Sequence, residues 1–101
     1  MKLIYILAFG LLLTACSSIE FAPADFNAKY PTKYSANDVK VYRSEKPEGK
    51  YKEIGLAHYK GAGLTAALDA IKKEASSQGG NAVIDIKVIP GGTVGTVVLF
   101  E

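Results

Sequence analysis

The feature that most constrains the fold is an apolar run at the start of the chain, Leu3–Leu13 (LIYILAFGLLL), which follows Lys2. A helix that spans a bilayer needs about 20 apolar residues, so this run is too short to span but suits the apolar part of a secretory signal peptide. We therefore expect residues 1–15 to be a signal peptide, which leaves residues 16–101 to fold. A chain of this length forms one small domain with a thin core and no deep cleft between domains.

The residues after the run form a second signal, Leu13-Thr14-Ala15-Cys16. This tetrapeptide resembles the lipobox of bacterial lipoproteins, in which a leucine stands three positions before the cysteine and small residues stand beside it. The resemblance implies that Cys16 becomes the N-terminal residue after cleavage, with a diacylglyceryl group on its thiol and often an acyl chain on its amine. Two or three acyl chains, each adding about 0.8 kcal/mol per buried methylene, anchor a protein firmly. The alternatives for Cys16 are a small buried residue of a helix and a reactive thiol.

The residue after the cysteine and the charge of the chain bear on location and partners. Ser17 follows Cys16, and in Gram-negative lipoproteins a residue other than aspartate there resembles the outer-membrane sorting pattern. We expect an envelope protein anchored in the outer membrane and facing the periplasm, with the inner membrane or a Gram-positive surface as alternatives. The net charge of only +2, with scattered lysines, does not suit a nucleic-acid binder. The expected partners are the membrane, through lipid on Cys16, and an envelope protein or cell-wall component.

Residues 17–38 show neither helical nor strand periodicity and contain two prolines with several Ser, Thr, Asn and Asp residues. We expect a lipidated N-terminus and tether over residues 16–38, followed by a small domain over residues 39–101. Disordered segments are usually poor in aromatic residues, yet this segment holds four. These are Phe21, Phe26, Tyr30 and Tyr34. Either they pack back onto the domain, or they bind a partner or the membrane interface.

Alternating apolar and polar residues predict two strands at the start of the domain, Val39–Arg43 and Tyr51–Tyr59. The turn-forming residues between them, Ser44–Gly49, favour an antiparallel hairpin with a long loop. Two further strands are predicted at Ala82–Ile89 and Val94–Phe100, joined by a tight turn and paired antiparallel. We expect the inward side chains of the third strand to lie beneath a helix. They are Ala82, Ile84, Ile86 and Val88.

The stretch Leu64–Gln78 predicts that helix, because apolar residues recur at offsets of four, seven and eleven from its first residue. We expect Thr65 to cap its start, Asp69 to pair with Lys73, and Gly79 to supply the left-handed residue at its end. The order β-β-α-β-β predicts the α+β class. The expected architecture is a two-layer sandwich of about four strands with the helix packed on one sheet face.

The passage from this helix into the third strand, Ala75–Ile84 (ASSQGGNAVI), resembles an Ala-x-x-x-Gly-Ala-Asn-Ala-Val element of two related groups. One is the YbjQ-type small domains, described as heavy-metal-binding. The other is the outer-membrane stress-sensor lipoproteins of the Rcs phosphorelay and similar envelope lipoproteins. Gly80 stands where these families usually have alanine, and the sensor's disulfide-forming cysteines are absent. The resemblance therefore implies the fold, while disulfide-dependent signalling does not carry over.

Candidate binding residues are few. Gly61 and Gly63 precede the predicted helix, where free backbone amides can hold an anion, but the motif lacks the Gly-Lys-Ser/Thr of nucleotide loops. His58 and Asn81 are the other candidates; packing is the alternative for the imidazole, and a tight helix-to-strand turn is the alternative for Asn81. One histidine and one cysteine do not make a transition-metal site, so we expect no metal and no other cofactor.

Catalysis is not expected either, because no Gly-x-Ser-x-Gly motif accompanies the histidine and the lipobox occupies the cysteine. Two functions remain. The first is a membrane-anchored, non-catalytic interaction or sensory module of the envelope. The alternative is a binder of a small molecule, anion or metal in a shallow site near Gly61–Gly63 and His58. Because the chain offers few polar groups that can converge on a ligand, the sequence favours the first.

Overall fold

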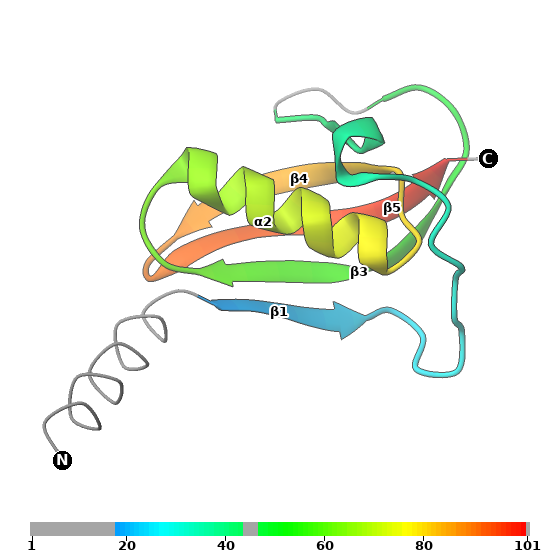
Figure 1. Cartoon of the computed structure of the whole chain (residues 1–101), viewed down its shortest axis with the longest axis horizontal. Coiled ribbons are helices and arrows are strands. Elements are labelled where there is room, and N and C mark those ends of the chain that lie inside the picture. Colours follow the sequence, from blue (N-terminus) through cyan, green and yellow to red (C-terminus); the bar gives the residue numbers. More distant parts are fainter. Residues whose placement is uncertain (1–17, 44–46, 101) are drawn as a thin grey trace, which may run out of the picture.

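One antiparallel-dominated sheet and one α-helix form the domain that the structure describes, residues 18–43 and 47–100 of a computed structural model (Figure 1). The sheet order is β1-β3-β5-β4-β2, and only the β2–β4 pair is parallel. The elements in chain order are β1 (Ser18–Pro23), the 3-10 helix η1 (Ala36–Asp38), β2 (Lys40–Val41), β3 (Tyr51–Lys60), α2 (Leu64–Ser77), β4 (Ala82–Ile89) and β5 (Gly92–Phe100). The α+β class is confirmed, with five strands where about four were expected. Within the described ranges no helix has both the length and the apolar character needed to cross a membrane.

The additional strand, β1, comes from the segment in which we expected a tether. It runs antiparallel to β3 from the pair Ser18 and Lys60 to the pair Pro23 and Gly55. Phe21 packs against the main buried cluster, and Gly55 leaves it room, because a Cβ at Gly55 would collide with the Phe21 ring. The prediction of a tether over residues 16–38, with a domain starting at residue 39, is therefore wrong for the described residues.

The predicted hairpin between the strands at Val39–Arg43 and Tyr51–Tyr59 is also wrong. Only Lys40–Val41 of the first predicted range forms a strand, β2, which pairs with the start of β4 at one edge of the sheet. β3 lies on the other side of β5, so β4 and β5 separate the two strands. Residues 44–46 of the predicted loop lie outside the described residues. β5 lies between β3 and β4 because it pairs with β3 along one edge and with β4 along the other.

Helix α2 contributes three fully buried residues to the main cluster, Ala67, Ile71 and Ala75. They lie in the same cluster as the sheet residues Ala57, Val83 and Val97. The helix starts at Leu64 after Gly63, whose φ is +96°, and no side chain caps it, so the predicted cap by Thr65 is wrong.

The end of α2 is as predicted. Gly79 has φ +91°, its N–H donates to the Ser76 carbonyl oxygen at 3.1 Å, and the Gly80 N–H donates to the Ala75 carbonyl oxygen at 2.8 Å. This pair of bonds is a Schellman motif, which requires a left-handed residue that glycine adopts without strain. No ion pair joins Asp69 to Lys73; among residues 18–43 and 47–100 the one ion pair within 4.0 Å joins Lys60 to Glu20.

The face that β4 presents to α2 differs from the expectation. Val83 is the residue in the helix-side cluster, whereas Ile84 lies on the opposite face with Ala82 and Val98, covered in part by Tyr42, Tyr51 and Phe100. A bulge at Asp85, with φ +52°, then shifts the register, so Ile86 joins the helix side. Gly95 makes room there, because a Cβ on it would lie 2.7 Å from Val83 Cγ1. At the start of β4, Ala82–Ile84, both faces of the strand are buried, and alternation alone therefore selected the wrong one.

Candidate functional site

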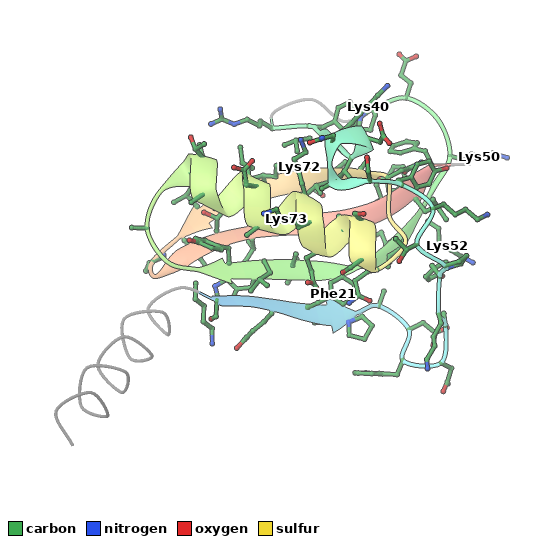
Figure 2. The ribbon with its side chains drawn as sticks, viewed as in Figure 1. Phe21, Lys40, Lys50, Lys52, Lys72 and Lys73 are labelled. Carbon is green, nitrogen blue, oxygen red and sulfur yellow. The ribbon has the colours of Figure 1, made fainter. Side chains whose placement is uncertain are left out.

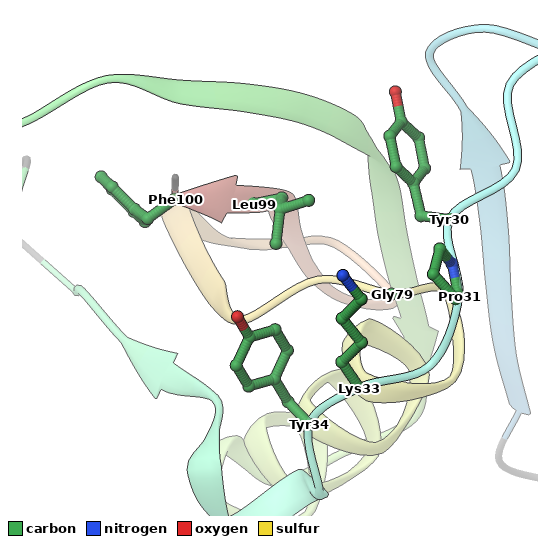
Figure 3. Close-up of a pocket in the computed structure, with 7 residues that line it drawn as sticks. All are labelled: Tyr30, Pro31, Lys33, Tyr34, Gly79, Leu99 and Phe100. Carbon is green, nitrogen blue, oxygen red and sulfur yellow. The ribbon is translucent and has the colours of Figure 1, made fainter.

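Two adjoining hollows lie at the end of the sheet where β3 begins and β5 ends, and Figure 3 shows the one that is lined by Tyr30, Lys33 and Leu99. One has a volume of about 290 Å³ and the other of about 510 Å³, and Tyr34 and Phe100 line both. We call the combined feature the Tyr34–Phe100 groove. Its aromatic and charged lining residues are Tyr30, Lys33, Tyr34, Asp38, Lys40, Tyr42 and Phe100.

One wall of the groove is the segment that precedes β2, and α2 holds it in place. The Thr32 hydroxyl donates a hydrogen bond of 3.0 Å to the Ser77 carbonyl oxygen, and the buried Ser76 hydroxyl donates to the Tyr34 carbonyl oxygen. Figure 3 shows Tyr34 and Lys33 pointing from this segment toward the sheet end. The last turn of α2 therefore fixes the position of the two side chains that overhang the groove.

The floor of the groove is organised by Asn81. Its Nδ2 donates to the Phe100 carbonyl oxygen at 3.2 Å, and the Phe100 N–H donates to its Oδ1 at 2.9 Å. Its own carbonyl oxygen accepts from the Lys40 N–H at 3.1 Å. The Phe100 ring contacts the Tyr51 ring, with centroids 5.2 Å apart. Asn81, predicted as a binding candidate, thus lines the groove with its amide already bonded to β5.

Several lysines lie at this end of the domain, together with the exposed carboxylates of Glu48 and Glu53 near the start of β3. Lys33 and Lys40 line the groove against one carboxylate, Asp38, which accepts a 2.8 Å hydrogen bond from the Ser35 hydroxyl. Lys52 lies over the Tyr30 ring, with its Nζ 5.7 Å from the centroid, and Figure 2 shows Lys40, Lys50 and Lys52 at the same end of the domain. Ammonium groups beside half-buried aromatic rings suit an anionic partner with flat or apolar parts.

The other predicted binding residues lie elsewhere. Gly61 and Gly63 form the turn from β3 to α2, at the opposite end of the sheet from Asn81. His58 is near that turn but points to the face away from α2, since its neighbour Tyr59 belongs to the helix-side cluster. The His58 Nε2 is buried and has no hydrogen-bond partner among the described residues. The structure therefore brings the two glycines together but does not assemble the four candidates into one site.

Two further observations concern acidic groups. The Lys60 Nζ donates a 2.7 Å hydrogen bond to Glu20 Oε1, and this bond, with the charge of the ammonium, lowers the pKa of the Glu20 carboxyl from its ordinary value of 4.5. In the part of the chain that the structure describes, no three His, Cys, Asp or Glu side chains converge in a way that holds a metal ion. Cys16 lies outside the described residues.

The lysines of the groove were missed at the sequence level. The available signal was the set of aromatic residues in a segment of otherwise loop-like composition, and one of the two interpretations given for it, packing onto the domain, applies to Phe21 and Tyr30. Phe26 is 85% exposed and does not pack in this way. Lys33 and Lys40 carry no motif; only the return of the chain over α2 places them together.

Comparison with known proteins shows a similarity in fold. No protein-family model matches the chain, and no curated protein matches it. A solved structure described as a Francisella virulence factor, FvfA, in an orthorhombic crystal form is similar, with a TM-score of 0.56. The similarity covers 84% of this chain and 99% of that one at 13% sequence identity, so it concerns the fold alone.

Proposed function

We propose that this chain is a bacterial envelope lipoprotein, anchored through lipid on Cys16, whose domain is a non-catalytic interaction module. The module is a two-layer α+β sandwich that binds an anionic segment of an envelope protein or a cell-wall component in the Tyr34–Phe100 groove. The observation that carries the interaction is the gathering of Tyr34, Lys33 and Lys40 around one hollowed end of the sheet. The lipobox supports the anchor.

Chemistry and geometry support a binding role for the groove over the glycine turn. Tyrosine is enriched in protein interfaces because it buries a large ring and keeps a polar hydroxyl. The lysines add charge complementarity, which steers an acidic partner toward the groove. The alternative site near Gly61–Gly63 has its imidazole on the face of the sheet away from α2, so His58 and the two glycines do not form one site.

The position of the groove in the fold fits a membrane-anchored role. β1 begins at Ser18, beside Lys60 at the end of β3, whereas the groove lies near Tyr51, at the start of that strand. Ten residues of strand at 3.3 Å each separate the two ends by about 30 Å. A protein anchored by its N-terminus thus carries the groove at the far end.

The anchor is tested by Cys16→Ala. The variant is expected to lose acyl labelling and signal-peptide processing, because the lipidation chemistry requires the thiol, and the uncleaved signal then holds it at the inner membrane. Unchanged labelling together with an intact outer-membrane fraction contradicts the anchor.

The interaction is tested by reversing charge in the groove. In cells treated with a chemical crosslinker, the double variant Lys33→Glu/Lys40→Glu is expected to lose the partner that co-purifies with the wild-type lipoprotein. The matched control is Lys72→Glu/Lys73→Glu, which changes the net charge equally on α2 (Figure 2). Loss of the partner in both variants, or in neither, contradicts a role for the groove.

A further inference from the structure

The end of the domain from which β1 starts carries an exposed apolar surface. The start of β1, the β3–α2 turn and the β4–β5 turn lie together at this end (Figure 1). Val88 is 72% exposed and lines a hollow with Leu64, Ile86 and Arg43. The residues of this apolar end surface are Ala62, Leu64, Val88, Ile89 and Pro90.

Basic side chains lie closest to this surface, while the nearest acidic residues in the chain, Asp69 and Asp85, lie farther along α2 and β4. Residues 60–68 and 86–100 contain no aspartate or glutamate, while Lys87 and Arg43 are exposed beside it. The nearby Glu20 carboxylate is paired with Lys60. An apolar patch with basic side chains closest to it complements an anionic phospholipid surface, where apolar side chains enter the interface and basic groups meet headgroups.

The number of residues between Cys16 and β1 limits how far this end of the domain can lie from the lipid anchor. Cys16 stands two residues before Ser18, so even a fully extended chain puts the two Cα atoms no more than about 7 Å apart. Ser18 pairs with Lys60, the residue next to the β3–α2 turn. Once acyl chains hold Cys16 in a bilayer, Ser18 and the neighbouring β3–α2 turn stay close to the headgroups, and the apolar end surface belongs to this same end of the domain.

We propose that the apolar end surface rests on the phospholipid bilayer that holds the acyl chains of Cys16. Val88 and Ala62 enter the interface, and Lys87 and Arg43 lie over anionic headgroups. The inference rests on the proposed acylation of Cys16 and goes beyond it. The domain does not move freely on a flexible linker but lies on the membrane in one orientation, with the Tyr34–Phe100 groove directed away from the bilayer.

The chain contains no tryptophan, so a single introduced tryptophan reports its own environment. The mature acylated protein is purified from membranes as Val88→Trp, Ala62→Trp or the control Phe26→Trp, whose site is 85% exposed in the loop after β1. Each is reconstituted into vesicles of phosphatidylethanolamine and phosphatidylglycerol, with or without brominated acyl chains. Val88 and Ala62 are exposed in the isolated domain, and circular dichroism checks that each variant keeps its fold.

The expected result is that brominated lipid quenches the tryptophans at positions 88 and 62, and that acrylamide quenches them at least about threefold less than the tryptophan at position 26. Mass spectrometry of the N-terminal peptide from the same samples reports the acyl groups. Acylated, vesicle-bound protein in which acrylamide reaches all three positions equally overturns the docking and leaves the anchor intact. A Cys16 without acyl groups overturns the anchor and the docking together.

Discussion

Replacement of Phe21 by alanine tests whether β1 is part of the folded core. Replacing a fully buried phenylalanine by alanine lowers the free energy of unfolding by about 3–5 kcal/mol. Because Phe21 is only partly buried, we expect Phe21→Ala to lower it by about 2 kcal/mol. For a domain of this size each kcal/mol lowers the melting temperature by roughly 4–8 °C, which predicts a decrease of about 8–16 °C.

The matched control is Phe26→Ala, because Phe26 belongs to the same segment and is 85% exposed. A surface substitution of this kind changes the free energy of unfolding by no more than about 0.5 kcal/mol. Thermal and urea unfolding of the protein without residues 1–16, followed by circular dichroism, measures both variants. If the two have equal effects, β1 is not docked on β3 and the segment is the tether that the sequence suggested.

The remaining predictions concern the burial of Ile84 in β4, the ion pair between Lys60 and Glu20, and the stability of the fold at acid pH. Ile84→Asp is expected to lose more than about 3 kcal/mol of unfolding free energy, since Ile84 is fully buried and the carboxylate has no partner there, whereas the exposed Lys87→Asp stays within about 0.5 kcal/mol; equal urea midpoints refute this placement. Because the pKa of Glu20 is lower in the folded state, its contribution to stability is present above the unfolded pKa and is lost as pH falls through the folded value. Lys60→Met is expected to return the pKa of Glu20 to near 4.5 in an NMR titration, and an unchanged titration contradicts the pairing.

Elements defined by neighbouring residues could be predicted from the sequence. α2 follows from its apolar spacing, and its end follows from the ability of Gly79 to adopt a positive φ, so both were predicted to within a residue or two. The turn between β4 and β5 is also local, with Gly91 at φ +89°. In these cases, the interactions that decide the structure lie within one turn of the chain.

Elements decided by distant contacts could not be predicted. β1 contains a proline and is only six residues long, so its strand character comes from pairing with β3 and from the space at Gly55. The bulge at Asp85 changes which face Ile86 presents, and no residue in the sequence marks it. The groove could not be predicted either, because Lys33 becomes a site residue only when its segment folds back over α2.

Site-specific photocrosslinking in living cells tests the central claim, that the Tyr34–Phe100 groove is the surface by which an anchored envelope protein binds its partner. A photoreactive phenylalanine replaces Tyr34, which lines both hollows, or Asp69, which is exposed on α2. We expect a covalent adduct with one envelope component from position 34 and none from position 69. Adducts from position 69 with none from position 34 would contradict it.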